Sequence, residues 1–242
     1  MFTTSGKITA LDGYIVEISD GVTITSDNAN RIGDTNKYLC AADAELTLSA
    51  KTGYTLESST VTISEDTTIT ATLDTANHYV LANDTSTLAT ESNTATYPDL
   101  IKVYKISLPA NVTASGIGVI MIGNNFYATG GANVTFDAGT GRAIEPVTIE
   151  NKDIEITAAD FFYTVTTPNG FEIVADDEYK YTFNNTTYYK DGAQLKLQVV
   201  NGTATDVAIE GGETLAKNSD GTYSFKIGGV TTITGNLSQE GS

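Results

Sequence analysis

Hydrophobic and polar residues alternate along this chain in short runs, and one run occurs three times. The three runs are Leu46-Thr47-Leu48, Val134-Thr135-Phe136 and Leu195-Lys196-Leu197. A period of two predicts a strand with one face inward and the other in solvent. Each run has a glycine seven positions after its first residue, at Gly53, Gly141 and Gly202. The spacing predicts three copies of one β-unit.

Further anchors recur upstream of each run. The aromatic residues that begin the recurring segment are Tyr38, Phe126 and Tyr188. Farther upstream, a tyrosine is followed eight positions later by a bulky apolar residue, in the pairs Tyr14 and Val22, Tyr104 and Val112, and Tyr163 and Phe171. Shared spacing at this many anchors is hard to obtain by chance, so it supports the threefold repeat.

The same patterns define the expected fold class. No window shows a 3.6-residue stripe of helical length, turn formers recur at short intervals, and Thr, Val, Ile and Tyr favour strands. We expect an all-β protein of three tandem small antiparallel β-sandwich domains, immunoglobulin-like or of a β-repeat type. Short helical turns are expected at residues 27–32 and 157–160.

The repeat spacing also sets the expected domain boundaries. Domain 1 should cover residues 1–73, domain 2 residues 100–158, and domain 3 residues 159–242, the last with an insertion. Residues 74–99 match no copy and are rich in Thr, Ala and Asn, so we expect a linker or an insertion there. This predicts a loose joint after domain 1 and a rigid one between domains 2 and 3.

The charge is strongly one-sided, with 30 acidic residues against 13 basic ones and a formal net charge of −17. Phosphate contacts need clustered Lys and Arg, so the composition argues against nucleic acid and anionic membrane surfaces as partners. The acidic residues are scattered, which favours a solvated surface; a cation-binding surface is the alternative. No apolar stretch approaches the length of a membrane span, and residues 1–13 lack the features of a signal peptide.

Residues suited to catalysis are scarce. His78 is the single histidine and Cys40 the single cysteine, so an intrachain disulfide and a Cys/His zinc site are excluded by count. Cys40 lies at an apolar strand position, which favours a buried structural thiol over a reactive one. Gly116-Ile117-Gly118 lacks the lysine and helix of a phosphate loop and is better explained by a bulge or a close strand approach. We therefore expect no enzymatic activity and no cofactor.

The remaining candidates for binding are in domain 3. Tyr179, Tyr181, Tyr188 and Tyr189 are close in sequence, and alternation should turn one of each adjacent pair to solvent. Cross-strand aromatic packing is the favoured interpretation, and binding of a glycan or a protein partner is the alternative. The acidic run Asp176-Asp177-Glu178 is expected to be a solvated turn, with a weak calcium site as the alternative.

The first copy carries motifs similar to those of a known family. Leu46-Thr47-Leu48, Gly53-Tyr54, Val61-Thr62-Ile63 and Asp66-Thr67-Thr68-Ile69-Thr70-Ala71 resemble bacterial extracellular repeat modules related to internalin B-type repeats. The resemblance implies a stalk or adhesive spacer on a bacterial surface, and no catalytic residues come with it. Similar immunoglobulin-like modules decorate phage capsids and tails.

These observations predict a non-enzymatic structural or display protein. We expect it on the exterior of a phage particle, as a capsid decoration, head fibre or tail-associated component, with domain 1 as the docking end. The alternative is a stalk or adhesin fragment on a bacterial cell surface. The expected partner is a capsid, tail or cell-surface protein or a surface glycan, with a homo-oligomer on a particle as a further expectation.

Overall fold

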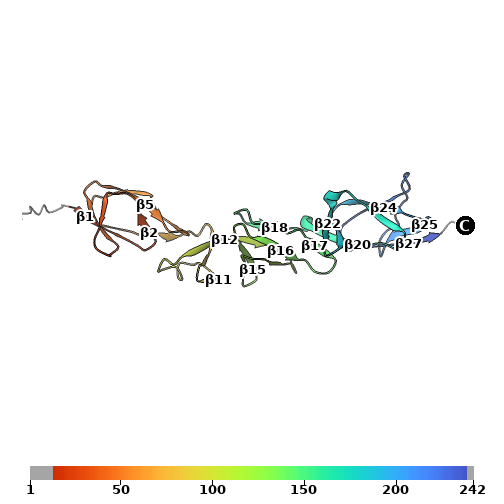
Figure 1. Ribbon diagram of the computed structural model, residues 1–242, viewed down its shortest axis with the longest axis horizontal. Coiled ribbons are helices and arrows are strands. Elements are labelled where there is room, and N and C mark those ends of the chain that lie inside the picture. Colours follow the sequence, from red (N-terminus) through yellow and green to blue (C-terminus); the bar gives the residue numbers. More distant parts are fainter. Residues whose placement is uncertain (1–12, 239–242) are drawn as a thin grey trace, which may run out of the picture. The chain divides into compact units, whose positions relative to one another are not determined.

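The computed structural model describes residues 13–238, and its regular structure is all-β apart from two short 3-10 turns (Figure 1). This confirms the prediction that the protein is all-β. The chain divides into two compact units, unit 1 ending at Tyr104 and unit 2 beginning at Lys105.

The described part of unit 1, residues 13–104, contains eleven strands and the beginning of a twelfth (Figure 1). They are β1 (Gly13–Ile18), β2 (Val22–Ile24), β3 (Ala29–Arg31), β4 (Lys37–Ala41), β5 (Glu45–Ala50), β6 (Tyr54–Thr55), β7 (Thr60–Thr62), β8 (Thr67–Ile69), β9 (Thr72–Leu73), β10 (His78–Leu81), β11 (Asp84–Leu88) and β12 (Leu100–Ser107). Strand β3 lies where a helical turn was predicted at residues 27–32, so that prediction was wrong.

The first copy of the repeat, β1 to β9, is built from two small sheets. In one, β1 lies between β4, its antiparallel partner, and β8, its parallel partner. In the other, β5 lies between β2 and β7. Alternation along β5 turns Leu46 and Leu48 into the core, as the sequence predicted. Cys40 is 1% exposed in the same core, which confirms a buried thiol, and burial raises its pKa.

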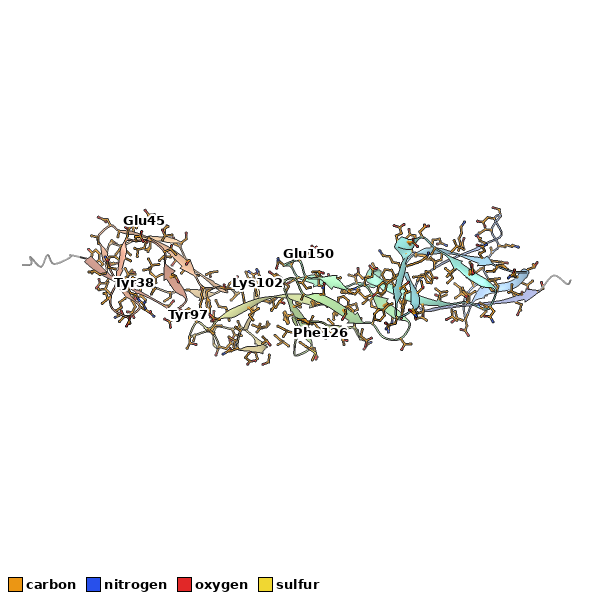
Figure 2. All side chains as sticks on the ribbon, in the orientation of Figure 1. Tyr38, Glu45, Tyr97, Lys102, Phe126 and Glu150 are labelled. Carbon is orange, nitrogen blue, oxygen red and sulfur yellow. The ribbon has the colours of Figure 1, made fainter. Side chains whose placement is uncertain are left out.

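Residues 74–99, for which a linker or insertion was predicted, contain β10 and β11. Strand β10 pairs with β12, and Tyr79 and Val80 are buried. Tyr97, labelled in Figure 2, packs against the first copy's core, where its ring lies 5.3 Å from that of Tyr54 and its hydroxyl donates to the Ala71 carbonyl. The segment therefore supplies apolar cover to unit 1.

Unit 2 begins within β12 and continues through the remaining elements (Figure 1). These are β13 (Thr113–Ser115), β14 (Val119–Ile122), β15 (Asn125–Thr129), β16 (Asn133–Asp137), β17 (Arg142–Ile144), β18 (Val147–Thr148), β19 (Ile154–Glu155), η1 (Ala158–Asp160), β20 (Phe161–Thr166), β21 (Phe171–Val174), η2 (Asp177–Tyr179), β22 (Lys180–Phe183), β23 (Thr186–Lys190), β24 (Gln194–Val199), β25 (Thr203–Ile209), β26 (Tyr223–Lys226) and β27 (Thr231–Ser238). The turn η1 confirms the helical turn predicted at residues 157–160.

The pairing scheme of the first copy recurs twice more. In the second copy, β12 lies next to β15 and pairs in parallel with β19, while β16 lies between β13 and β18. In the third, β20 pairs with β23 and in parallel with β27, and β24 lies between β21 and β26. The strand pairing thus repeats threefold within two compact units.

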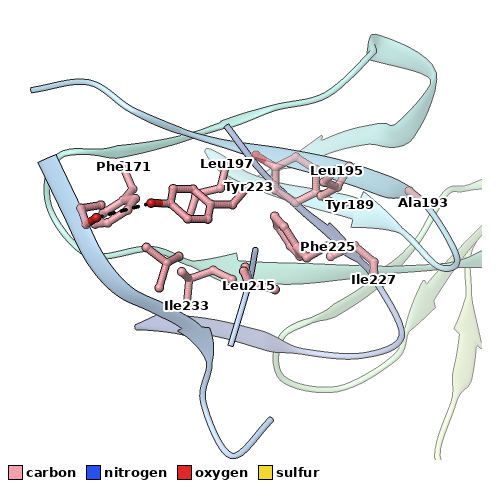
Figure 3. Packing of buried hydrophobic residues seen from close by; sticks show 12 residues of the cluster. Phe171, Tyr189, Ala193, Leu195, Leu197, Leu215, Tyr223, Phe225, Ile227 and Ile233 are labelled. Atoms are coloured by element: carbon pink, nitrogen blue, oxygen red, sulfur yellow. Dashed lines mark hydrogen bonds between the residues drawn. The ribbon is translucent and has the colours of Figure 1, made fainter. Parts of the chain in front are cut away.

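Figure 3 shows the core of the third copy. Leu195 and Leu197 are fully buried between Phe171 on β21 and Phe225 on β26. The Tyr223 hydroxyl donates a hydrogen bond of 3.4 Å to the Ala204 carbonyl, which satisfies the only polar atom of that side chain. The predicted inward positions of this copy are confirmed.

Within unit 2, the second and third copies are joined by a strand pair. Strand β17 of the second copy pairs antiparallel with β20 of the third, bringing Arg142 opposite Tyr163 and Ile144 opposite Phe161. Phe161 packs in the second copy's core beside Val112. Backbone hydrogen bonds and shared apolar burial therefore connect these two copies.

A close backbone approach explains Gly116, as the sequence predicted for the Gly-Ile-Gly run. Its φ is +146°, and a Cβ atom placed there would collide with the Asn133 carbonyl oxygen. Glycine is the residue that fits both conditions. The turn leaves Ile117 96% exposed.

Candidate functional site: an aromatic groove in unit 2

The β22–β23 hairpin presents part of the predicted tyrosine cluster. Its turn is formed by Asn184 and Asn185, both with positive φ, as tight hairpins of this kind require. Tyr181 and Phe183 are two residues apart and share one strand face, and Tyr188 lies directly opposite Tyr181. The hairpin thereby gathers three aromatic rings.

These rings lie in mutual contact rather than as separate side chains. The Tyr181 and Phe183 rings are nearly parallel, with centroids 6.2 Å apart and an interplanar angle of 9°. The Tyr181 ring also lies 6.4 Å from Tyr188 and 5.6 Å from Phe162. Phe183 nevertheless remains 51% exposed. The hairpin therefore carries an aromatic platform that is open to solvent.

The two other predicted tyrosines lie elsewhere. Tyr189 is 8% exposed and packs in the third copy's core, and burial raises its pKa. Strand register pairs it with Tyr163, as Cys40 pairs with Tyr14, so the first copy's equivalent of Tyr189 is Cys40. Tyr188 thus corresponds to Leu39, and its alignment with Tyr38 was wrong by one residue. Tyr179 ends η2 and lies half-buried against the same core.

The platform forms one wall of a groove of about 420 Å³. The opposite wall comes from the second copy and includes both polar and apolar side chains. The lining residues are Ser115, Thr135, Phe136, Asp137, Ala138, Gly139, Arg142, Ala143, Ile144, Pro146, Tyr181, Phe183 and Tyr188. The β17–β20 pairing positions these two walls, because it fixes the second copy against the third.

Polar groups in the groove offer both donors and acceptors. The Asp137 carboxylate accepts the Gly139 amide through Oδ1 at 2.9 Å, and the Ser115 and Thr135 hydroxyls lie 2.9 Å apart. Arg142 is exposed and its guanidinium lies near Gly139. Burial raises the pKa of Tyr181, and the nearby Glu145 carboxylate raises it further. The Tyr181 hydroxyl therefore stays protonated as a donor at neutral pH.

Sequence reasoning found only part of this site. Tyr181 and Tyr188 were identified because the tyrosines of this region lie close together in the sequence. Arg142 stands out because it follows Gly141, whereas Tyr54 follows the equivalent Gly53 in the first copy. Phe183 was missed, although its place two residues after Tyr181 is a signal for a shared strand face. Ser115, Thr135 and Asp137 were missed because only the fold brings the second copy's sheet to this hairpin.

The acidic run Asp176-Asp177-Glu178 lies at and within η2 and is exposed. Lys180 Nζ forms an ion pair of 3.1 Å with Asp177, and Glu178 raises the pKa of the adjacent Tyr179. Among residues 13–238 no group of three or more His, Cys, Asp or Glu side chains is arranged to hold a metal ion. The run has the geometry of a solvated turn.

His78 lies on β10, where it is opposite Val103 in the strand register. Cys40 lies on β4, in a different sheet of unit 1. In the described part of the chain no helix is long and apolar enough to cross a membrane.

Comparison with known proteins found no matching family model, no matching curated protein and no matching solved structure.

Proposed function

We propose that this chain is a non-enzymatic structural protein that displays three small β-domains on the exterior of a phage particle. It would serve there as a capsid decoration, a head fibre or a tail-associated component. The observation that carries this proposal is the threefold recurrence of one strand-pairing scheme. Tandem copies of one small domain are typical of scaffolds and display surfaces, since each added copy extends the surface by the same step.

The charge and the joint between copies support the same function. A formal net charge of −17 makes neighbouring molecules repel one another, which suits a protein arrayed at high density on a particle. The β17–β20 pairing holds the third copy on the second through backbone hydrogen bonds. A terminal copy can then be displayed without a flexible tether between these two.

The first copy, within residues 1–73, is the proposed docking end. Segment 74–99 separates it in sequence from the other two copies, which follow one another directly. The residues that line the aromatic groove belong to unit 2, so docking through the first copy does not use them. A protein of the capsid or tail is the proposed partner.

Cross-linking of intact particles tests the location and the docking end together. Purified phage particles would be treated with a lysine-reactive cross-linker, and linked peptides identified by mass spectrometry. We expect links from Lys37 or Lys51 of the first copy to a capsid or tail protein, and none to such a protein from Lys196 or Lys226 of the third. Absence of the chain from every particle fraction would refute the location, and links from the third copy alone would refute the docking end.

A stalk or adhesin fragment on a bacterial surface is the second candidate. The motifs of the first copy, among them Gly53-Tyr54 and Asp66-Thr67, favour it because they resemble bacterial extracellular repeat modules. Immunogold labelling of phage particles and of bacterial cells with the same antiserum separates the two. Labelling of the cell envelope in the absence of particles supports the stalk.

A further inference from the structure

We propose that the aromatic groove of unit 2 binds a neutral glycan, with one pyranose ring lying on the exposed ring of Phe183, which stacks on Tyr181. This inference does not depend on whether the chain is carried by a phage or a cell. It rests on the geometry of the platform, the polar groups that face it and the charge around it.

The platform has the shape that a sugar ring needs. A pyranose ring presents polarised C–H bonds on one face, and these are attracted to the electron-rich face of an aromatic ring. Tyr181 and Phe183 are nearly parallel, stacked rings with centroids 6.2 Å apart, and a flat ligand can lie on the exposed ring of Phe183. Phe183 keeps half of its surface exposed in the groove, and a ligand bound there would remove that surface from water.

The opposite wall supplies the hydrogen bonds that sugar hydroxyls require. Each hydroxyl both donates and accepts, so its partner site must contain both kinds of group. The Asp137 carboxylate accepts, the Arg142 guanidinium donates through a planar fork, and the Ser115 and Thr135 hydroxyls do both. A purely apolar protein segment would displace water from these groups without offering them hydrogen bonds, at a cost in affinity.

Charge and size narrow the ligand class. Asp137 and Arg142 balance each other, while Glu145 lies close enough to Tyr181 to raise its pKa, and the chain as a whole is strongly acidic. The acidic surroundings would repel anionic sugars, and the balanced charges of Asp137 and Arg142 within the groove favour a neutral sugar over a cationic one. A volume of about 420 Å³ lies within the range of roughly 300–1,000 Å³ typical of small-ligand sites, so the groove accepts a short part of a glycan chain.

Oligosaccharide binding by the full chain tests the proposal. The probes are maltohexaose, cellohexaose, chitohexaose and a dextran oligomer as neutral glycans, with an oligogalacturonate as the anionic comparison. Binding would be measured by calorimetry and by shifts of amide resonances in NMR spectra. We expect at least one neutral probe to bind and to shift resonances of β17, β22 and β23, and the oligogalacturonate not to bind.

Matched variants connect binding to the groove. Phe183→Ala and Arg142→Gln should each weaken binding about tenfold or more, because each removes a contact made with the sugar itself. Ile117→Ala is the control, since Ile117 is also exposed and apolar but lies outside the groove lining. Thermal unfolding of all three variants should match the parent chain, so that lost binding is not lost folding.

Two results would overturn the proposal. One is that no neutral probe binds at concentrations up to about 10 mM, well above the weak end of specific recognition. The other is that Phe183→Ala binds as tightly as the parent chain. If the groove variants instead abolish association with a particle or cell-surface protein while no glycan binds, the groove is a protein-binding site and the glycan proposal is wrong.

Discussion

Tyr54 and Arg142 occupy equivalent positions in the first and second copies, yet Tyr54 is buried and Arg142 is exposed. Each follows a glycine with positive φ, and each begins a short strand, β6 or β17. The preceding glycine carbonyl accepts a backbone amide of the following segment in both, from Asp74 to Gly53 at 2.8 Å and from Thr164 to Gly141 at 2.9 Å. The backbone frame of the two copies is the same at this point.

The surroundings of the two side chains differ. Tyr54 is 7% exposed because segment 74–99 covers it: its ring meets Tyr97, and its hydroxyl donates to the Pro98 carbonyl at 3.2 Å. Arg142 has no such segment above it and lines the groove instead. The repeated backbone therefore sets where a side chain starts, while the segment that follows decides whether the side chain is buried or exposed.

Truncating the two side chains should give the largest contrast. Tyr54→Ala removes a buried ring and a hydrogen bond, so unit 1 should lose about 3–5 kcal/mol of stability. Arg142→Ala changes an exposed side chain and should alter stability by no more than about 0.5 kcal/mol. Native-state hydrogen exchange measures the two units separately. Similar losses at both sites would break the comparison.

The stability of unit 1 at alkaline pH tests whether its core buries tyrosine hydroxyls. Tyr79 is the residue to follow, because it shares this core with Tyr54. Burial, together with a hydrogen bond of 2.9 Å to the Asp74 carboxylate, raises the pKa of Tyr79 to about 12. Burial also acts to raise the pKa of Asp74, but hydrogen bonds from Asn77, Tyr79 and the Ala76 amide outweigh it and lower that pKa.

The sign of the effect follows from proton binding. Between the ordinary tyrosine pKa near 10 and the folded value, the folded state keeps the Tyr79 proton while the unfolded state loses it. Stability is therefore complete below pH 10 and falls as pH rises toward 12, by about 1–3 kcal/mol for unit 1. Urea unfolding at several pH values measures this. Tyr79→Phe should flatten the dependence, and an equally steep fall in this variant would assign it to other groups.

A smaller effect is expected from the aspartates that hold the frame itself. Asp66 accepts the Ile15 amide at 2.7 Å in the first copy, and Asp153 accepts the Lys105 amide at 2.8 Å in the second. Asp66→Ala and Asp153→Ala should each cost about 1–2 kcal/mol, since a charge-assisted hydrogen bond to the first strand is lost. Val230 takes this place in the third copy, so Val230→Ala is the matched control and should cost less. Unequal losses at the two aspartates would show that the frames are not equivalent.

Much of this frame could be predicted from sequence because its signals are local. The alternating triplets place Leu46, Val134 and Leu195 inward, and all three are fully buried. The anchors Val22, Val112 and Phe171 were found by spacing and are also buried. Period-two alternation depends only on neighbouring residues, so no knowledge of the tertiary fold is needed to recognise it.

What could not be predicted depends on distant residues. The parallel pairing of β1 with β8 and the pairing of β17 with β20 join segments whose sequences carry no mark of their partner. Residues 74–99 have the composition of a loop, yet Tyr79 and Tyr97 of this segment pack in the core of unit 1. Only part of the groove could be predicted, for the same reason. Its tyrosines lie close together in the sequence, whereas the polar residues of its other wall do not.

The smallest expected effect comes from making the two positions identical. Arg142→Tyr gives the second copy the residue of the first, but no counterpart of Tyr97 or Pro98 covers the new ring, which would project into the groove. If the following segment decides burial, stability should change by about 0.5 kcal/mol or less, as for other surface substitutions. Thermal unfolding measures this, with Arg142→Gln as the control for lost charge. A gain in stability of about 1 kcal/mol or more would mean that the repeated backbone can bury a tyrosine at this position without a covering segment. Segment 74–99 would then not be the cause of the burial of Tyr54.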